Sequence, residues 1–245
     1  VQVTSGSSKF NLQTMPVDEY PSLPEMPTAT GTVNADEFAT AVGQASAAAS
    51  RDEMLPLLTG IRLELEGSNI SLMATDRFRA SLRDLNWHPE VSDISAQALV
   101  PARVLSETAK ALTAGSDVTI AVSAGETGDG LIGFEGTVAG GQRRTTTRLL
   151  EGDFPRVRQL FTAQSETVAY LSTRTLVDAV KRMALVAERN TPIRLSFTQG
   201  QVLLEAGSGD EASASESIEA TVEGNDISIG FNPTYLLEGL SVMSD

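Results

Sequence analysis

The chain has 245 residues, of which 41% are hydrophobic and 5% aromatic, and its net charge is −14 at pH 7. It contains no cysteine and one histidine, His88. Disulfides, thiol nucleophiles and thiolate metal sites are therefore excluded, and a histidine-based triad or a multi-histidine metal centre is not expected. The length suits two domains. The sequence contains no run of about 18 apolar residues, so no membrane-spanning helix is predicted.

The first 27 residues predict an extended segment. The sequence from Lys9 to Leu12 alternates like a strand, and four prolines between residues 16 and 27 disfavour a helix. The chain begins with Val1 rather than Met, and it lacks the basic and apolar regions of a secretory signal. We therefore expect a fragment or a trimmed form of a cytoplasmic protein.

A first helix is predicted to begin after Asn34, whose side chain suits an N-cap. Phe38 and Ala45 mark the ends of an apolar stripe at helical spacing, and the helix is expected to end at Arg51. Apolar alternation then predicts strands at 61–65, 69–74 and 79–85.

Residues 87–89, with the sequence Trp-His-Pro, are expected to form a loop. Pro101 suits the first turn of a second helix, which should run over 102–114 and stop at Gly115. Short strands are predicted on either side of this helix, at 98–100, 118–122, 131–134 and 143–149.

The same pattern then starts again. The sequence Ile-Arg-Leu at 61–63 recurs at 193–195, and the proline-led second helix at Pro101 recurs at Pro233. Self-similarity of this length indicates repeated domains rather than a solenoid of small units. The chain therefore divides into the end of one unit at 1–28, a whole unit at 29–164 and most of another at 165–245.

No arrangement of residues in the sequence supports catalysis. The 32 acidic residues form no pair with an accompanying base or with metal-ligand spacing. The glycine-rich run at 125–130 leads into a predicted strand and lacks the lysine of a phosphate-binding loop. The sequence therefore argues against an enzyme, and no metal or cofactor is expected.

Two of the predicted helices are net positive in this acidic chain. Residues 173–187 place three basic residues near Asp178, and residues 102–114 place two near Glu107. These charges suit either a solvated face or a surface that follows a phosphate backbone without reading bases. The residues concerned are Arg103, Lys110, Arg174, Lys181 and Arg182, with Arg51 at the end of the first helix.

The segment from Met73 to Leu82 carries Phe78 between two arginines, shortly after Asp76. It suits a turn initiated by the aspartate, with solvated arginines. The spacing favours this turn, and the segment also suits a recognition loop for a partner peptide, because aromatic and arginine side chains are enriched where proteins bind one another.

Five segments carry a family resemblance that covers nearly the whole chain. They are Leu-Thr-Gly-Ile at 58–61, Ala-Thr-Asp-x-x-Arg at 74–79, Val-Pro at 100–101, Leu-Glu-Gly-Asp-Phe-Pro at 150–155 and Gly-Phe-Asn-Pro-x-Tyr-Leu-Leu at 230–237. In this order and spacing, the chain resembles the bacterial β sliding clamp, the processivity subunit of DNA polymerase III. The resemblance implies an α+β DNA clamp fold, in which each repeated domain has two inner helices and antiparallel outer sheets. Residues 1–28 would then end the first domain, 29–164 would form the second, central domain, and 165–245 would form a truncated third domain.

The resemblance implies a DNA polymerase processivity factor, a non-catalytic subunit of the DNA polymerase III holoenzyme. Two full-length chains would form a homodimeric ring around duplex DNA, without sequence specificity and without a cofactor. The expected partners are the clamp loader, the catalytic subunit of the replicative polymerase, and other polymerases and repair proteins that carry a clamp-binding motif. The residues alone leave an alternative, a non-catalytic β-rich protein-interaction module without DNA binding.

The resemblance also implies site residues. Partner peptides would enter a pocket between the second and third domains, lined by Leu58, Thr75, Arg77, Phe78, Arg79, Ala80, Pro155, Gln159, Leu160, Asn232 and Tyr235. The DNA-facing residues would be Arg51, Arg103, Lys110, Arg174, Lys181 and Arg182, and the dimer interface would include Leu185 and Ala187. Arg77 and Phe78 replace a Gly-His pair of the best-known relatives, and Ala80 replaces a larger aliphatic residue, which leaves the peptide preference open.

Overall fold

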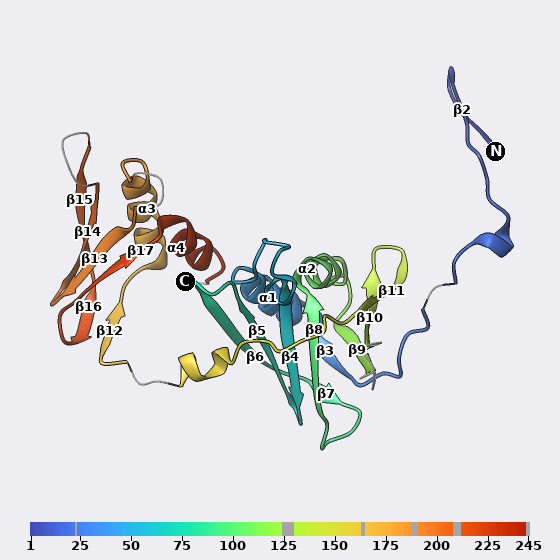
Figure 1. Ribbon diagram of the computed structural model, residues 1–245, viewed down its shortest axis with the longest axis horizontal. Helices are drawn as coiled ribbons and strands as arrows, with labels where there is room; N and C mark the ends of the chain where they lie inside the picture. Colours follow the sequence, from blue (N-terminus) through green and yellow to red (C-terminus); the bar gives the residue numbers. More distant parts are fainter. Residues whose placement is uncertain (23, 124–129, 163–164, 188–190, 208–211, 244–245) are drawn as a thin grey trace.

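The computed structural model describes residues 1–22, 24–123, 130–162, 165–187, 191–207 and 212–243. Most of the glycine-rich run at 125–130 thus lies outside the described residues. An N-terminal hairpin is followed by two units, each built from helices and antiparallel sheets (Figure 1). This arrangement confirms the α+β class and the repeated organisation that the sequence predicts.

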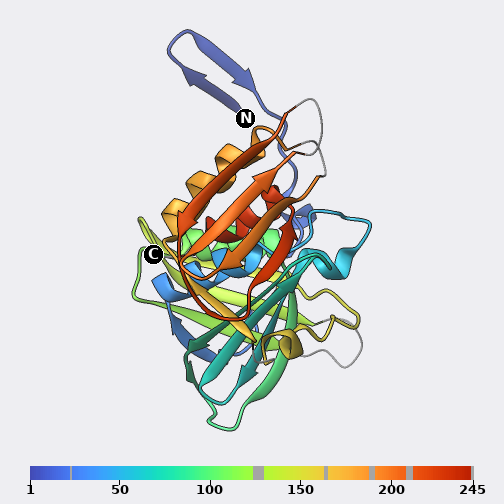
Figure 2. The same ribbon diagram turned by 90° about the vertical axis from the view of Figure 1, so that its left-hand side faces the viewer.

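The N-terminal hairpin pairs β1 (Gln2–Ser5) with β2 (Ser8–Asn11), and all of residues 1–22 are exposed. Within the described part of the segment that follows, the one regular element before Gly31 is the 3₁₀ turn η1 (Val17–Glu19). The hairpin stands away from both units in the two views (Figure 1, Figure 2). It therefore contributes nothing to their cores.

The first unit packs two helices, α1 (Ala35–Ser46) and α2 (Ala102–Ala111), against two sheets. One sheet has the strand order β11-β10-β9-β3-β7, and the other has the order β6-β5-β4-β8. The strands are β3 (Gly31–Asn34), β4 (Gly60–Glu66), β5 (Asn69–Thr75), β6 (Ala80–Asn86), β7 (His88–Pro89), β8 (Ser95–Pro101), β9 (Asp117–Ser123), β10 (Leu131–Val138) and β11 (Gly141–Arg148). The strands predicted at 61–65, 69–74 and 79–85 are thus found within one residue at each end.

Helix α1 begins as the sequence predicts. The Asn34 side-chain oxygen accepts hydrogen bonds of 3.1 Å from the backbone N–H groups of Asp36 and Glu37, which have no partner inside the helix. The helix ends at Ser46 rather than at the expected Arg51. The Ala48 N–H bonds to the carbonyl of Ala45, three residues back, and this tighter turn closes the helix.

Two other predicted helix ends also lie too far along the chain. Helix α2 ends at Ala111 rather than at residue 114, because the next N–H, that of Leu112, is shared between the carbonyls of Thr108 and Ala109. The helix predicted over 173–187 is α3, which ends at Ala184. Helix ends are the least certain part of a prediction from sequence, because the last turn often tightens.

The loop expected at 87–89 is wrong. Trp87 is buried, its indole nitrogen donates a 2.7 Å hydrogen bond to the Gly67 carbonyl, and His88–Pro89 form β7, paired with β3. Strand β3 needs a glycine where it passes the Trp87 ring. A Cβ atom on Gly31 would lie 2.5 Å from a ring carbon of Trp87.

The second unit repeats this plan around α3 (Thr173–Ala184) and α4 (Pro233–Leu240). Its larger sheet has the order β15-β14-β13-β17, and β12 pairs separately with β16. The strands are β12 (Thr167–Tyr170), β13 (Ile193–Thr198), β14 (Gln201–Ala206), β15 (Ala214–Glu219), β16 (Thr221–Gly224) and β17 (Ile227–Phe231). Between the units lie the 3₁₀ turn η3 (Val157–Phe161) and a short connection, and another 3₁₀ turn, η2 (Pro56–Thr59), precedes β4.

The apolar side chains form two main cores, one in each unit. A smaller cluster, Met73, Leu99, Phe154 and Val157, holds η3 against the outer face of the β4–β5 sheet. Among the described residues, no helix is both long and apolar enough to cross a membrane.

Phe38 should be one of the side chains on which the first core depends. It is fully buried, and its ring lies 5.9 Å from that of Phe134. We expect Phe38→Ala to lower the free energy of unfolding by about 3–5 kcal/mol, because the substitution leaves a cavity. Urea denaturation measures this change. The matched control is Phe10→Ala in the exposed hairpin, which should change it by less than about 0.5 kcal/mol. Equal effects of the two substitutions would contradict this description of the core.

Candidate functional site

The loop from β5 to β6 is fixed by its own short side chains. The carboxylate of Asp76 accepts hydrogen bonds of 3.0 Å from the backbone N–H groups of Phe78 and Arg79. The Thr75 hydroxyl donates to the Arg79 carbonyl at 2.7 Å and accepts from the N–H of Arg77 at 3.1 Å. Arg77 has a φ of 78° and is the one described non-glycine residue with a positive φ. This conformation is costly for a side chain with a Cβ, so the loop persists because these bonds hold it.

Arg79 joins this loop to α4 of the second unit. Its guanidinium donates to Asp76 at 3.0 Å and to Glu238 at 2.5 Å, and it lies 4.7 Å above the ring centre of Tyr235. The Arg79 side chain is 17% exposed and that of Glu238 is 27% exposed. Paired charges that are largely shielded from water interact more strongly than pairs on an open surface.

Further contacts connect the same two units. The rings of Phe78 and Tyr235 stack with centres 5.8 Å apart, and the Gln44 amide donates to the Val242 carbonyl at 3.1 Å. Arg51 reaches the second oxygen of Glu238 at 3.1 Å. Glu238 therefore binds two arginines of the first unit.

Helix α4 presents Tyr235 and Glu238 to these partners because of how it begins. The Asn232 side chain accepts hydrogen bonds from the N–H groups of Thr234 and Tyr235 at 2.9 and 3.2 Å, and Pro233 occupies the first helical position. Tyr235 and Glu238 lie three residues apart and so share one face of the helix.

Two hollows lie on either side of Tyr235. One, of about 310 Å³, is lined by Gln44, Arg79, Ala80, Leu82, Val242 and Met243. The other, of about 600 Å³, is more apolar and is lined by Phe78, Phe231, Asn232, Leu236, Leu240 and Met243. The structure thus brings together Phe78, Arg79, Ala80, Asn232 and Tyr235, five of the eleven residues assigned to the peptide pocket.

The remaining assigned pocket residues are placed in three other ways. Pro155 and Gln159 line a separate hollow of about 610 Å³ between η3 and the β4–β5 sheet, and Leu160 on η3 is 65% exposed. Leu58 and Thr75 are buried. Arg77 is exposed and lines a third hollow at the same junction, of about 310 Å³, together with Phe78, Arg79 and Tyr235.

Glu238 and Gln44 also contribute to the junction, although neither is among the site residues predicted from the sequence. A usable signal for Glu238 was its spacing of three residues from Tyr235 on a predicted helix, which places both side chains on one face. Gln44 gave no comparable signal, because its partner is a backbone carbonyl 198 residues away.

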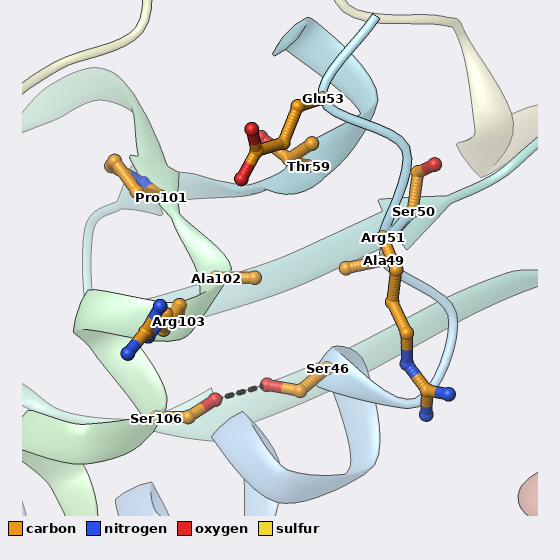
Figure 3. Close-up of a pocket in the computed structure, with 10 residues that line it drawn as sticks. All are labelled: Ser46, Ala49, Ser50, Arg51, Glu53, Thr59, Pro101, Ala102, Arg103 and Ser106. Atoms are coloured by element: carbon orange, nitrogen blue, oxygen red, sulfur yellow. Dashed lines mark hydrogen bonds between the residues drawn. The ribbon is translucent and has the colours of Figure 1, made fainter. Parts of the chain in front are cut away.

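Two of the three predicted DNA-facing residues of the first unit line a hollow of about 400 Å³ between α1 and α2 (Figure 3). Arg51 and Arg103 lie on opposite sides of it, and Ser46 and Ser106 are hydrogen-bonded at 2.6 Å across the two helices. Arg103 pairs with Glu107 at 3.1 Å, although both side chains are largely exposed. Lys110 is exposed in the last turn of α2. Arg51 lies in the loop after α1, which corrects its expected place at the helix end.

On α3, Arg174 and Lys181 are exposed, whereas Arg182 is held by Glu216 of β15 through two hydrogen bonds of 2.8 and 2.5 Å. The hydrogen bond from Arg182 lowers the pKa of the Glu216 carboxyl below its usual range. Because Glu216 already neutralises Arg182, this side chain is less available to an anionic ligand than Arg174 and Lys181 are. Leu185, the first residue after α3, is 85% exposed, and Ala187 packs partly against the second core.

Among the described residues, no three histidine, aspartate or glutamate side chains come together in a way that could hold a metal ion. The features that remain are the junction around Tyr235 and the exposed cations of the helices. Neither arrangement offers a nucleophile with an adjacent base.

Glu238 should fix α4 against the first unit. We expect Glu238→Gln to weaken its charge-assisted hydrogen bonds by about 1.5 kcal/mol, so that α4 amides exchange hydrogen about tenfold faster. Hydrogen exchange with mass spectrometry measures this rate. The control is Glu107→Gln, which removes a carboxylate from an exposed pair within one helix and should leave exchange in α4 unchanged. Unaltered exchange in Glu238→Gln would show that the junction does not depend on this carboxylate.

Comparisons with known proteins are consistent with this geometry. Residues 32–156 match the family model described as DNA polymerase III beta subunit, central domain, and residues 158–245 match the model for its C-terminal domain. The Beta sliding clamp of Streptomyces coelicolor is 58% identical over 241 residues, which cover 98% of this chain and 63% of that protein. The Beta sliding clamp of Micrococcus luteus is 48% identical over 91% of this chain and 70% of that protein.

A solved structure gives the same result for the fold. The DNA polymerase sliding clamp from Bacillus subtilis superposes with a TM-score of 0.85 at 27% identity, over 100% of this chain and 63% of that one. The chain thus spans about 63% of the length of the Streptomyces relative. It belongs to the DNA polymerase III beta subunit family.

Proposed function

We propose that this chain is the larger part of a DNA polymerase processivity factor, a sliding clamp that encircles duplex DNA and tethers a replicative polymerase. The observation that carries the proposal is the match of two successive domain models of one family over nearly the whole chain. In this proposal residues 1–28 end a first domain, 29–164 form the central domain and 165–245 belong to the third. The protein acts in the bacterial cytoplasm, is not catalytic and needs no cofactor.

The charge of the chain is compatible with this role. A net charge of −14 opposes ordinary binding to nucleic acid, which depends on neutralising phosphates. A closed ring is retained by its topology, so weak contacts with the phosphate backbone are sufficient and strong contacts would slow sliding. Lys110, Arg174 and Lys181 are the exposed helix cations that make these contacts in the proposal, whereas Arg51, Arg103 and Arg182 are already paired with carboxylates.

The other partners follow from the family. Two full-length chains join as a homodimer, with Leu185 and Ala187 at the contact, and a clamp loader opens the ring. The catalytic subunit of the polymerase, and other polymerases and repair proteins, insert a peptide between the central and third domains. The hollows beside Tyr235 and the exposed Leu160 support this assignment, since both leave apolar surface for a partner.

A chimera tests the topological claim. This chain can replace the corresponding segment of the Streptomyces coelicolor relative, since 98% of it aligns there. Loaded by the clamp loader of that organism, the chimera should stay on a nicked circular plasmid during gel filtration and be lost after the plasmid is linearised. Retention on the linear form would indicate ordinary binding, and absence from both forms would favour the alternative of a protein-interaction module without DNA binding.

Charge variants of the same chimera provide the controls. Arg174→Gln and Lys181→Gln should each lower the amount loaded and its sensitivity to salt, because exposed cations near phosphate act through screened electrostatics. Arg182→Gln should have a smaller effect, because Glu216 already neutralises this arginine. An equal loss for all three variants would contradict the proposed roles.

A substitution in η3 tests the pocket. Leu160→Asp should reduce binding of a clamp-binding peptide by at least about 30-fold, because a carboxylate would lose its hydration against an apolar partner. Fluorescence polarisation with the labelled peptide measures affinity. Val91→Asp, at another exposed apolar position far along the chain, should leave the affinity unchanged. If Leu160→Asp bound as tightly as the unsubstituted chain, Leu160 would not belong to the pocket.

A further inference from the structure

The loop between β5 and β6 presents one unpaired cation beside one exposed aromatic ring. Arg77 is exposed, and within the described chain its side chain makes no hydrogen bond or ion pair. Phe78, the next residue, is 76% exposed even though it stacks on Tyr235. An arginine next to an aromatic ring is a combination that protein interfaces favour.

Arg79 cannot supply the free charge at this position. Its guanidinium is bound by Asp76 and by Glu238 and covers the ring of Tyr235, and its side chain is 17% exposed. Three carboxylates line the same hollow as Arg77. Asp76 and Glu238 are paired with Arg79, and Asp52 accepts a 2.9 Å hydrogen bond from the Met54 N–H, so none of the three is paired with Arg77. Of the two arginines of this loop, the one that offers an unpaired charge to a ligand is therefore Arg77, although Arg79 is the arginine of the family motif.

The loop is also rigid enough to hold Arg77 in one place. Four hydrogen bonds from Thr75 and Asp76 fix the backbone around it. A ligand that uses this arginine need not order the loop first, which removes part of the entropic cost of binding.

We propose that Arg77 and Phe78 set the peptide specificity of this chain, and that the preferred partner is a linear peptide with a carboxylate within two positions of a large apolar side chain. The carboxylate pairs with Arg77. The apolar side chain packs on Phe78 and enters the hollow of about 600 Å³ lined by Phe231, Leu236 and Leu240. The proposal rests on the proposed function, because it assumes that partner peptides bind at this junction.

Charge complementarity determines which occupant fits. An acidic peptide gains from Arg77, whereas a basic peptide would place like charges together. A contact at an exposed rim mainly affects the association rate and is weakened by salt. The preference for acid should therefore be modest in size and should disappear at high ionic strength.

The test begins with a phage-displayed library of random heptapeptides, selected on the 245-residue chain. The strongest binder and its counterpart with the acid changed to the amide are then compared by fluorescence polarisation. At low salt the unsubstituted chain should bind the acidic peptide about three- to fivefold more tightly than its amide counterpart. At about 1 M salt it should bind the two peptides with about the same affinity. Phe78→Ala should weaken both peptides by about tenfold or more.

Two substitutions at position 77 separate the effect of the arginine charge from the effect of the backbone conformation. Arg77→Gln keeps a side chain in the strained conformation, whereas Arg77→Gly relaxes it. Both substitutions should reduce the ratio of the affinities for the acidic peptide and its amide counterpart to about one. The control Arg143→Gln, on the exposed strand β11, should leave this ratio unchanged. If the preference persists in Arg77→Gln, or if selected peptides show no acid, Arg77 does not set specificity even though the pocket stands. If no peptide from the library binds the chain, both this proposal and the peptide pocket fail.

Discussion

The junction of the two units depends on one guanidinium group. Arg79 lies where the β5–β6 loop meets α4, and Asp76, Glu238 and the face of Tyr235 surround it. Each neighbour supplies what a partly buried arginine needs, since two carboxylates, one of them shared with Arg51, balance its charge and a ring shields its flat face. Without this arrangement the same position would hold an uncompensated charge between two helix–sheet units, and the hollows on either side of Tyr235 would lose their common wall.

The local sequence prepares this contact from both sides. Thr75 and Asp76 bend the chain sharply after β5, so that Phe78 and Arg79 point away from the first core. Asn232 and Pro233 start α4 directly after β17, so that its first turn carries Tyr235 and its next turn carries Glu238. Short-range hydrogen bonds therefore determine which long-range partners can meet. The separation of the junction from both cores also leaves it accessible to a ligand.

Much of the fold could be predicted from sequence because its signals are local. The alternation in β4, β5 and β6 and the cap at Asn34 depend on neighbours within a few residues. The ends of α1, α2 and α3 and the burial of Trp87 could not be predicted, since they depend on turn tightening and on a glycine in another strand. At the site, the motif indicated Arg79 and Tyr235. The partner of Arg79 in the second unit, Glu238, and the pairing that neutralises the Arg79 charge become visible only when two distant segments are placed together.

Trp87 has a consequence for how the molecule can be observed. It is the one tryptophan of the whole chain, and it is buried in the first unit, with its indole nitrogen bonded to Gly67. The second unit has its own core and contains no indole. Tryptophan fluorescence, excited at a wavelength that tyrosine does not absorb, therefore reports the state of one unit alone, while circular dichroism averages over both. Because chains with more than one core need not unfold in a single step, a difference between the two optical signals would measure how independently the units melt.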